Sequence, residues 1–300
     1  MKQWRLGIDL GGTKIEAQLF DDENNACWSK RLPTPRGDYQ QTLETIKRLV
    51  SGAGEFTDQP FSIGLATPGA LSKTTGRMKN CNSICLNDQP LQRDLEANLQ
   101  RPVRLANDAD CMALAEAIDG AASKASSVFG IILGTGVGGG VVVEQRLLSG
   151  PNDIAGEWGH NPAVAIAGHH YSRPCYCGRL DCIETHLSGP GLVKTYQLIA
   201  ADNADSAMTS FDIVARKGQY CDMALEQYYQ MMAACIAQIV NMLDPHVIVL
   251  AGGMSRLPGV LTELEARLAD HVIGDSVKTQ LCLSHHGDAS GARGAAWLWP

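Results

Sequence analysis

A glycine-rich turn between two short apolar segments occurs twice in this sequence, and this duplication restricts the fold more than any other feature. The first copy has apolar segments at 6–10 and 15–20 on either side of Gly11-Gly-Thr13. The second copy repeats this layout 123 residues further along the chain. The equivalent pairs are Gly7 with Gly130, Leu10 with Leu133, and Gly11 with Gly134. Apolar alternation around a tight turn predicts a β-hairpin, so we expect two related halves.

Both turns are candidate phosphate-binding sites. Paired glycines let backbone N–H groups approach phosphate oxygens, and hydroxyl or ammonium groups at the turn add further donors. The residues concerned are Gly11, Gly12, Thr13 and Lys14 in the first turn, and Gly134, Thr135, Gly136 and Gly138 in the second. Asp9 ends the first strand and is a candidate Mg²⁺ ligand, directly or through water, whereas Ile132 stands at the equivalent position. The alternative is a plain hairpin that needs glycine only for its backbone.

The second turn also matches the G-x-G-x-x-G pattern of dinucleotide-binding folds, at 134–139. In those folds the glycines lead into a helix, and an acidic residue follows about 20 residues later. Here Val141-Val-Val143 predicts a continuing strand instead. The pattern therefore favours two glycine hairpins that hold one triphosphate, and it disfavours a nicotinamide-dependent dehydrogenase.

The rest of the chain alternates between helical and strand patterns. Helices are predicted at 39–53, 109–118 and 223–243, and strands at 61–66, 103–106 and 247–250, the last ending at Gly252-Gly253. This alternation is typical of an α/β fold that binds ligands at the ends of its strands. We expect a small N-terminal lobe at 1–118 and a second lobe at 119–300, with a C-terminal helix at about 288–300 that packs back on the first lobe.

The dipeptide Asn107-Asp108 lies between a predicted strand and a predicted helix. Asn and Asp are favoured as helix N-caps, which is the structural interpretation of this pair. A functional interpretation makes Asp108 a general base that accepts the proton of a substrate hydroxyl group, as phosphoryl transfer requires. The two roles are compatible with each other.

A candidate metal site lies in the second half of the chain. Glu157 and His160 flank a glycine-containing turn suited to vicinal hydroxyl groups, and Cys175, Cys177 and Cys182 follow in C-x-C-x₄-C spacing. Three thiolates need one further ligand to complete a tetrahedral Zn²⁺ site, and a closed site of this kind is structural rather than catalytic. The candidates for the fourth ligand are His160, His169 and His170. Three incidental buried thiols are the alternative.

Composition excludes several classes of function. The formal net charge of the chain is -7, which argues against a nucleic-acid partner. The first ten residues hold charged side chains and no apolar stretch typical of a signal peptide, so we expect a cytoplasmic protein with reduced cysteines. The apolar runs are far shorter than the ~20 residues that cross a bilayer, so no membrane association is expected.

Taken together, these segments resemble the ROK family of bacterial sugar kinases and repressors, within the actin-like ATPase superfamily. The resemblance covers nearly the whole chain. The motifs that carry it are Asp9-Leu-Gly-Gly-Thr-Lys14, Leu105-Ala-Asn-Asp108, Gly134-Thr-Gly-Val-Gly-Gly-Gly140, Gly156-Glu-Trp-Gly-His160, the cysteine segment at 175–184, and Asp244-Pro-His-Val-Ile-Val-Leu-Ala-Gly-Gly253. It implies an α/β, actin-like (ribonuclease H-like) fold with two lobes around a cleft, and ATP-dependent transfer of a phosphoryl group to O6 of a hexose.

The resemblance also implies roles for particular residues. Asp108 would be the catalytic base. The sugar-binding residues would be Gly69, Asn82, Asn107, Asp108, Glu157, His160 and Glu184. The residues that bind ATP and Mg²⁺ would be Asp9, Gly11, Gly12, Thr13, Lys14, Gly134, Thr135, Gly136, Gly138, Gly252 and Gly253. The ligands of a structural zinc ion would be His160, Cys175, Cys177 and Cys182. Members of the family often form homodimers, so a homodimer is expected.

Within the family, the segments 79–83, 155–162 and 286–300 are most similar to the fructokinase (manno(fructo)kinase) branch, which makes D-fructose the expected acceptor, with mannose and glucose as further hexoses. The N-acetylglucosamine kinase branch is close behind. Four residues depart from the usual pattern: Cys85 stands where fructokinases tend to have Trp, and Asp88, Asp181 and Ala251 stand where Gly is usual. A transcriptional repressor of the family would need a DNA-binding segment of about 70 residues ahead of the first glycine turn, and here that turn begins at Gly11.

Overall fold

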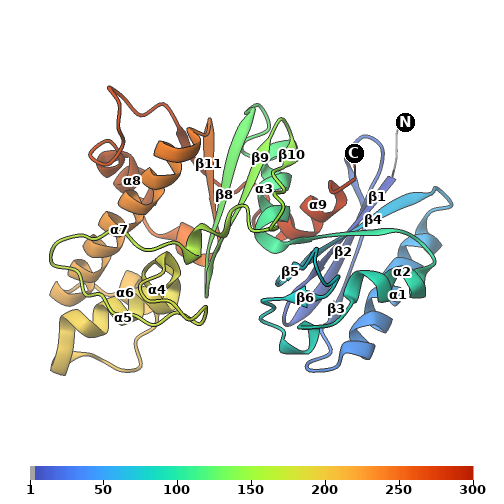
Figure 1. The fold of residues 1–300 in the computed structure, drawn as a ribbon, viewed down its shortest axis with the longest axis horizontal. Coiled ribbons are helices and arrows are strands. Elements are labelled where there is room, and N and C mark those ends of the chain that lie inside the picture. Colours follow the sequence, from blue (N-terminus) through green and yellow to red (C-terminus); the bar gives the residue numbers. More distant parts are fainter. Residues whose placement is uncertain (1–3, 300) are drawn as a thin grey trace. The chain divides into compact units, whose positions relative to one another are not determined.

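Two five-stranded sheets with the same arrangement of strands organise the chain in the computed structural model, which describes residues 4–299 (Figure 1). The first sheet has the order β3-β2-β1-β4-β7, and the second has the order β10-β9-β8-β11-β12. The strands of the first sheet are β1 (Trp4–Leu10), β2 (Lys14–Phe20), β3 (Ala26–Pro33), β4 (Phe61–Thr67) and β7 (Val103–Asn107). Those of the second are β8 (Ser127–Leu133), β9 (Val137–Val143), β10 (Arg146–Leu147), β11 (Val247–Ala251) and β12 (Gln280–Leu283).

The predicted duplication is confirmed. Strands β8 and β9 have the bounds of β1 and β2 shifted by the 123 residues that separate the two glycine turns. The pairing is also repeated, because β1 pairs in parallel with β4 and β8 pairs in parallel with β11. Asp9 lies opposite Ala66 in the first sheet, and Ile132 lies opposite Ala251 in the second. The carboxylate of Asp9 is therefore the main difference between two otherwise equivalent strand ends.

The helices and remaining short elements connect the strands. The helices are α1 (Tyr39–Phe56), α2 (Leu91–Leu99), α3 (Asp108–Ile118), α4 (Ile183–Leu187), α5 (Gly189–Ala200), α6 (Ser210–Ala215), α7 (Gln219–Leu243), α8 (Val260–Leu268) and α9 (Ser290–Ala296). A two-stranded sheet comprises β5 (Ala70–Leu71) and β6 (Met78–Lys79). The predicted helices and strands are present, with ends that differ by a few residues. Across residues 4–299, none of these helices combines the length and the apolar content needed to span a membrane.

The described chain forms two compact units. Unit 1 comprises 4–124, 140–155 and 285–299, and unit 2 comprises 125–139 and 156–284. The boundary expected at residue 118 lies inside unit 1, because the segment after α3 turns back on its own helix. There the N–H groups of Ala121 and Ala122 bind the side chain and the carbonyl group of Glu116. The expected C-terminal helix is shorter than 288–300, and as α9 it packs in unit 1 against β1, β4 and α3.

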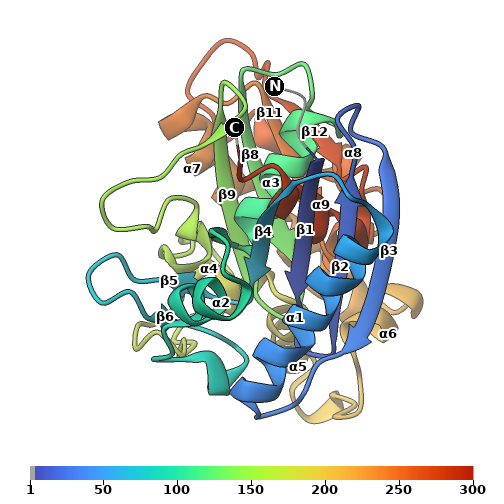
Figure 2. The same cartoon turned by 90° about the vertical axis from the view of Figure 1, so that its right-hand side faces the viewer.

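Opposite faces of the first sheet meet different helices. Leu6 and Ile8 pack in one apolar cluster with Ile46 and Leu49 of α1. Gly7 lies between them in the sequence and points to the other face, because side chains alternate along a strand. A Cβ atom at Gly7 would overlap the carbonyl oxygen of Ala292 in α9. Figure 2 shows α1 in front of this sheet and α9 behind it.

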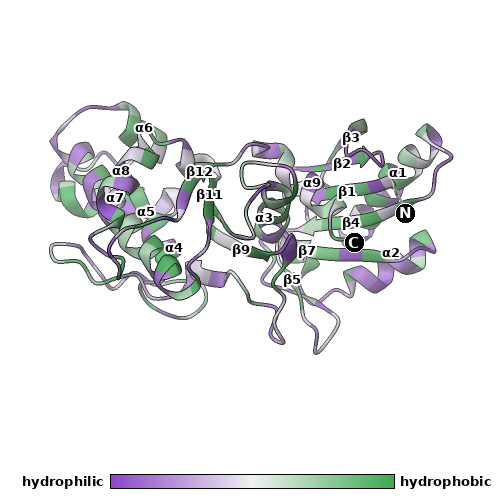
Figure 3. Ribbon diagram, turned by 90° about the horizontal axis from the view of Figure 1, so that it is seen from above, coloured by the Kyte–Doolittle hydropathy of each residue, from purple (hydrophilic) through white to green (hydrophobic). Residues whose placement is uncertain are grey.

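The contact between α9 and the first sheet is a backbone-to-backbone contact. A Cβ atom at Gly64 of β4 would overlap the carbonyl oxygen of Ala295, and one at Gly294 would overlap the carbonyl oxygen of Cys111 in α3. Glycines on both sides of the contact therefore let the helix lie directly on the strands. Strand β4 is buried at every residue, and its hydropathy can be followed in Figure 3.

We predict that Gly64→Ala destabilises the protein strongly. The added methyl group has no space, so α9 must move away from the sheet, and overpacking of this kind costs about 3 kcal/mol at the upper end of its usual range. Gly54→Ala is the matched control, because Gly54 lies in α1 with no atom near its Cβ position. There alanine should be neutral or should add up to about 1 kcal/mol. Urea denaturation measures both effects, and equal stability of the two variants would contradict the packing argument.

Candidate active site

The carboxyl ends of three parallel strands in unit 1 bring the first group of predicted site residues together. Strands β1 and β7 lie on either side of β4, and all three run in the same direction. Asp9 is the penultimate residue of β1, and Thr67, the last residue of β4, lies opposite Asn107, the last residue of β7. The edge at the carboxyl ends of parallel strands is where α/β folds bind ligands. Asp9, Asn107 and Asp108 thus lie at one edge of this sheet.

Asn107 and Asp108 have different positions at the start of α3. Asn107 is the N-cap of α3, and its side-chain oxygen accepts the N–H of Asp110 at 2.6 Å. Asp108 is the first residue of the helix; its side chain is exposed and accepts the N–H of Ala109 at 2.8 Å. A helix N-terminus favours an ionised carboxylate. The geometry therefore presents Asp108 as an accessible carboxylate with a fixed backbone.

Asp9 is half-buried beneath α9. The Cβ position of Gly291 lies 2.8 Å from Cγ of Asp9, so only glycine lets the helix cover this carboxylate. Burial, together with the negative charges of Asp108 and Glu16, raises the pKa of Asp9 to about 6. A carboxylate with this environment is stabilised in its charged form by a cation, and carboxylates are the usual protein ligands of Mg²⁺.

The first glycine turn is held from outside by Thr34. The hydroxyl group of Thr34 donates to the carbonyl oxygen of Gly11 at 2.7 Å, and its N–H donates to the carbonyl oxygen of Thr13 at 3.0 Å. Within the turn, the N–H of Gly11 donates to Lys14 at 3.0 Å. Gly12 and Thr13 are exposed. Lys14 is less available than the sequence suggested, because its ammonium group lies 3.2 Å from the carboxylate of Glu16.

Gly69 and Asn82, which the resemblance assigns to sugar binding, lie on adjoining loops of unit 1. Gly69 has no space for a side chain, because its Cβ position lies 2.6 Å from the carbonyl oxygen of Lys79. Asn82 is exposed, and it lines a cavity of about 340 Å³ together with residues of the first glycine turn. The lining residues are Leu10, Gly12, Thr13, Thr34, Pro35, Arg36, Thr42, Asn82, Ser83, Cys85 and Leu86.

Two residues that differ from the usual family pattern, Cys85 and Asp88, lie at this cavity or in its loop. Cys85 lines the cavity directly, so a larger residue at this position would reduce its volume. Asp88 has φ +62, in the left-handed region that favours glycine. This conformation explains why Gly is usual at position 88. It also shows that the loop keeps its shape with Asp in place of Gly.

In unit 2, the second glycine turn is tied to Glu184. The N–H of Val137 donates to the carboxylate of Glu184 at 2.8 Å. Gly136 lies against the same oxygen, which is 2.7 Å from its Cβ position. The turn itself is closed by the N–H of Gly134, which donates to Gly136 at 2.9 Å. A residue assigned to sugar binding is therefore positioned by a turn assigned to the nucleotide.

Gly252 and Gly253 follow β11 beside the end of β8. Gly252 has φ +85, and a Cβ atom there would overlap the carbonyl oxygen of Leu133. Ala251, where the family usually has Gly, is the last residue of β11 and is buried opposite Ile132. Ala251, which differs from the usual family pattern, thus lies within the sheet. Gly252, the glycine that the following turn requires, is present.

The structure brings the predicted zinc ligands together. The ligand atoms of His160, Cys175, Cys177 and Cys182 all lie within 4.8 Å of one another. The sulfur atoms of Cys177 and Cys182 are 3.5 Å apart, and Nδ1 of His160 is 3.5 Å from the sulfur of Cys175. Tetrahedral zinc with Zn–S bonds of about 2.3 Å requires ligand separations of about 3.8 Å. Of the three candidate histidines, His160 joins this cluster, whereas His169 contacts Gln230 at 3.3 Å.

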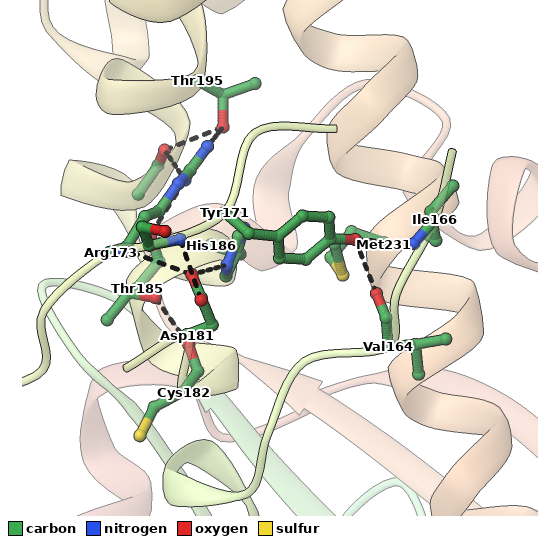
Figure 4. Close-up of polar contacts among 12 residues, drawn as sticks. Val164, Ile166, Tyr171, Arg173, Asp181, Cys182, Thr185, His186, Thr195 and Met231 are labelled. Carbon is green, nitrogen blue, oxygen red and sulfur yellow. Dashed lines mark hydrogen bonds and ion pairs between the residues drawn. The ribbon is translucent and has the colours of Figure 1, made fainter. Parts of the chain in front are cut away.

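Asp181 braces the loop that carries the cysteines (Figure 4). Its backbone has φ +54, where the family usually has Gly, and its carboxylate accepts the N–H groups of Ser172 and Arg173, each at 2.9 Å. These bonds join the two sides of the loop next to Cys182. The same carboxylate lies 3.4 Å from Nε2 of His186, whose pKa is lowered to about 4 by burial and by Arg173.

Arg173 completes this brace from within unit 2. Its guanidinium group is buried and donates to the carbonyl oxygens of Thr185 and Gly191 and to the hydroxyl group of Thr195, at 3.0, 3.2 and 2.9 Å (Figure 4). The cysteine loop is therefore anchored to α4 and α5 by hydrogen bonds of Arg173.

Tyr176 is a member of this site that the sequence analysis missed. Its hydroxyl group lies 2.8 Å from Nε2 of His160, and the two rings meet edge to face at 5.0 Å. Partial desolvation, together with the charges of Glu184 and Glu157, raises the pKa of Tyr176 to about 12. Tyr176, Glu157, His160 and Glu184 therefore lie near one another. The only signal in the sequence was an aromatic residue between two candidate ligands.

Comparisons with known proteins show which family the chain belongs to. The model of the ROK family matches residues 5–300. An N-acetyl-D-glucosamine kinase of Yersinia pseudotuberculosis serotype IB is 38% identical over 300 residues, which cover 97% of each chain. Among solved structures, the ROK hexokinase of Thermus thermophilus has a TM-score of 0.87 at 29% identity and covers 99% of this chain and 97% of that one. A ROK family glucokinase of Streptomyces griseus, solved with glucose and AMPPNP, has a TM-score of 0.75 at 25% identity over 98% of both chains.

The chain belongs to the ROK family, and within that family it is a sugar kinase, a transferase. The mixed α/β architecture expected from the resemblance, that of the actin-like ATPases, is confirmed by the same structures. The more specific similarity to the fructokinase branch is not confirmed by these relatives.

We predict that Asp9→Asn stabilises the metal-free protein at high pH. The pKa of Asp9 in the folded protein is about 6, above the ~3.9 of an unfolded chain. The folded state therefore binds this proton more tightly, and the cost of ionising Asp9 appears as the pH rises from about 4 to 6. Above pH 6 the variant should be more stable than the wild type by at most about 3 kcal/mol, and the difference should vanish below pH 4.

Urea denaturation in EDTA at pH 4, 6 and 8 measures this effect. Asp21→Asn is the control of opposite sign, because the N–H of Asn25 lowers the pKa of Asp21. The stabilisation by Asp21 is present at high pH and is lost on acidification, so its variant should be less stable than the wild type at pH 8. A pH-independent effect of Asp9→Asn would contradict the assignment.

Proposed function

We propose that this sugar kinase transfers the γ-phosphoryl group of ATP to the 6-hydroxyl group of a hexose, with D-fructose as the preferred acceptor. The observation that carries the proposal is the exposed carboxylate of Asp108 at the start of α3, on the strand edge that also holds Asp9. A general base at a ligand-binding edge next to a second carboxylate is what phosphoryl transfer to a hydroxyl group needs.

In the proposed reaction Asp108 accepts the proton of the 6-hydroxyl group as its oxygen attacks the γ-phosphorus in line with the departing ADP. The carboxylate of Asp108 is held at the helix terminus by the N–H of Ala109, so it is oriented before the acceptor arrives. Asp9 would hold Mg²⁺, which neutralises charge on the phosphate groups. The glycine turns at Gly11 and Gly134 would hold phosphate oxygens through their backbone N–H groups.

The proposed acceptor-binding groups are carboxylates, amides and an imidazole, which suit hydroxyl groups. They are Gly69, Asn82, Asn107, Asp108, Glu157, His160 and Glu184. Glu184 is fixed by Val137, and His160 by Tyr176. Hydrogen-bonding groups that are held in position in this way discriminate between sugars by the orientation of single hydroxyl groups.

We further propose a structural zinc ion bound by His160, Cys175, Cys177 and Cys182. The short separations between these ligand atoms support it. All four positions of a tetrahedral ion would be filled by protein, so the ion would order the loop rather than take part in the chemistry. Through Nδ1 of His160 and the peptide that links Cys182 to α4, the site would position His160 and Glu184 for the acceptor.

The choice of D-fructose rests on the similarity of the segments 79–83, 155–162 and 286–300 to fructokinases. N-acetyl-D-glucosamine is the second candidate, and two observations favour it. Curated relatives at 36–38% identity carry that name. In addition, Cys85 leaves the cavity beside Asn82 open, which is room for a substituent larger than a hydroxyl group.

An ADP-release assay across D-fructose, D-mannose, D-glucose, N-acetyl-D-glucosamine and N-acetyl-D-mannosamine tests the proposal. We expect the highest kcat/KM with D-fructose. If kcat/KM is tenfold or more higher with an N-acetylated sugar than with D-fructose, the second candidate replaces D-fructose as the proposed acceptor. If no sugar leads to ADP release, the proposal of hexose phosphorylation is itself contradicted.

We predict that Asp108→Asn lowers kcat by about 10²-fold or more, the usual scale for loss of a general base. Fold and sugar affinity should be retained, because the N-cap bond of Asn107 does not involve Asp108. Asp110→Asn is the control, since it changes a carboxylate in the same helical turn. A kcat of Asp108→Asn near that of the wild type would show that Asp108 is not the general base.

We predict that purified protein contains one zinc ion per chain, and that Cys177→Ser lowers zinc content, thermal stability and sugar affinity together. Cys282→Ser is the control, because Cys282 is half-buried in β12 of the same unit and lies outside the ligand cluster. Elemental analysis of freshly prepared protein measures the zinc. Its absence from active protein would overturn the proposal.

A further inference from the structure

The short helix α4 carries Glu184, and this helix is too short to hold its own position. It has five residues, Ile183–Leu187, far fewer than the about 12 residues at which an isolated helix becomes marginally stable in water. The last carbonyl groups of a helix also have no partner within that helix. The orientation of Glu184 therefore depends on groups outside α4 that bind these carbonyl groups.

Two side chains from other parts of unit 2 bind carbonyl oxygens of α4. Nη1 of Arg173 donates to the carbonyl oxygen of Thr185 at 3.0 Å, and the buried hydroxyl group of Tyr228 donates to that of Leu187 at 2.7 Å. Thr185 directly follows Glu184 in the sequence, whereas Leu187 is the last residue of the helix. Of the two side chains, Arg173 therefore holds the part of α4 next to Glu184.

The guanidinium group of Arg173 is buried although one of its donors is unused. Arg173 is 7% exposed, and its Nε atom has no hydrogen-bond partner within residues 4–299. Burial lowers the pKa of Arg173, and the carboxylate of Asp181 partly offsets this effect. A buried charge with an unused donor adds little to stability. This arrangement points instead to the groups that the other donors of Arg173 hold in position.

The other donors of Arg173 join α4 to α5. Nη1 also donates to the carbonyl oxygen of Gly191 at 3.2 Å, and Nη2 donates to the hydroxyl group of Thr195 at 2.9 Å (Figure 4). A guanidinium group presents such donors in a rigid planar fork. Helix α5 is in turn tied to the second glycine turn, because the N–H of Gly189 donates to the carbonyl oxygen of Gly134 at 2.8 Å. Arg173 therefore fixes α4 against a helix that is bound to this turn.

The carboxylate of Glu184 meets the same turn directly. Its Oε2 atom accepts the N–H of Val137 at 2.8 Å. With Oε2 bound to the turn, the direction of Oε1 follows from the orientation of α4. Glu184 is half-buried, so part of its side chain is accessible to a ligand.

We infer that Arg173 is a positioning residue for the acceptor. By holding the carbonyl group of Thr185, it fixes the carboxylate of Glu184 in the orientation that binds a hydroxyl group of the sugar, and it thereby sets the selectivity between hexoses. A binding group discriminates by the direction of its hydrogen bond only if the residues behind it hold it in place. The inference rests on the proposed role of Glu184 in binding the acceptor.

Arg173→Met tests the inference, because methionine fills much of the same space and removes the donors. The backbone of Arg173 is held separately, since its N–H donates to the carboxylate of Asp181 at 2.9 Å and its carbonyl oxygen accepts the N–H of Asp181 at 2.8 Å. The cysteine loop should therefore keep its shape, and elemental analysis should show the zinc content of the wild type.

Calorimetry with D-fructose and with N-acetyl-D-glucosamine measures the effect on the acceptor. Arg173→Met should bind the preferred sugar about 10-fold more weakly, the scale of one hydrogen bond to a charged group. The ratio of kcat/KM between the two sugars should move towards one. Thr195→Val removes only the partner of Nη2 and is the milder variant, for which we expect a loss of about 3-fold.

A double-mutant cycle with Glu184→Gln separates positioning from general destabilisation. If Arg173 acts through Glu184, Arg173→Met should not weaken sugar binding further in the Glu184→Gln background. Tyr228→Phe is the matched control, because it removes the other buried side-chain tether of α4, at Leu187. It should lower thermal stability and leave the sugar affinity as in the wild type.

Three outcomes would overturn the inference: additive losses of sugar affinity in the cycle, wild-type sugar affinity in the folded Arg173→Met and Thr195→Val variants, or an equal loss in Tyr228→Phe. A Glu184→Gln variant that binds both sugars as tightly as the wild type would instead contradict the proposed acceptor role of Glu184, and the inference with it. The failure of the inference alone and the failure of the proposed function are thus distinguishable.

Discussion

Direct contact between the backbone of α9 and the strands of the first sheet is the constraint on which unit 1 depends. Gly7 and Gly64 remove the side chains that would separate helix and sheet, and Gly294 does the same between α9 and α3. The last helix of the chain thereby holds the first strand. The same contact also affects the protonation of Asp9. Gly291 lets α9 cover Asp9, and the resulting burial raises the pKa of that carboxyl group.

The two sheets share the strand arrangement that the fold requires, and they differ at a residue proposed to take part in catalysis. Both copies keep the hairpin, the strand order and the parallel partner of the first strand. Only the first copy has a carboxylate at the strand end, where Asp9 corresponds to Ile132. Two glycine hairpins are thus available to hold phosphate groups, while one carboxylate is available for a cation.

The cysteine loop shows how a departure from a family pattern is accommodated. Position 181 requires left-handed backbone, which glycine adopts without strain. Asp181 adopts it here while its carboxylate accepts two backbone N–H groups of the same loop. The side chain thus compensates for the conformation and adds a link between the two strands of the loop. The loop is then held by hydrogen bonds of Asp181 and Arg173.

Local pattern in the sequence was sufficient for the hairpins, the helices and the family, because glycine turns and apolar periodicity depend on neighbouring residues. The cap formed by Asn107 and the identity of the loop that carries Cys175 also follow from local order. Tyr176 was not predicted, because an isolated aromatic residue has no signature until the fold places it beside His160. The choice of His160 over His169, the raised pKa of Asp9 and the packing of α9 likewise depend on contacts between residues distant in the chain. Such contacts are decided by tertiary packing, which alone determines burial, charge proximity and the space left for a side chain.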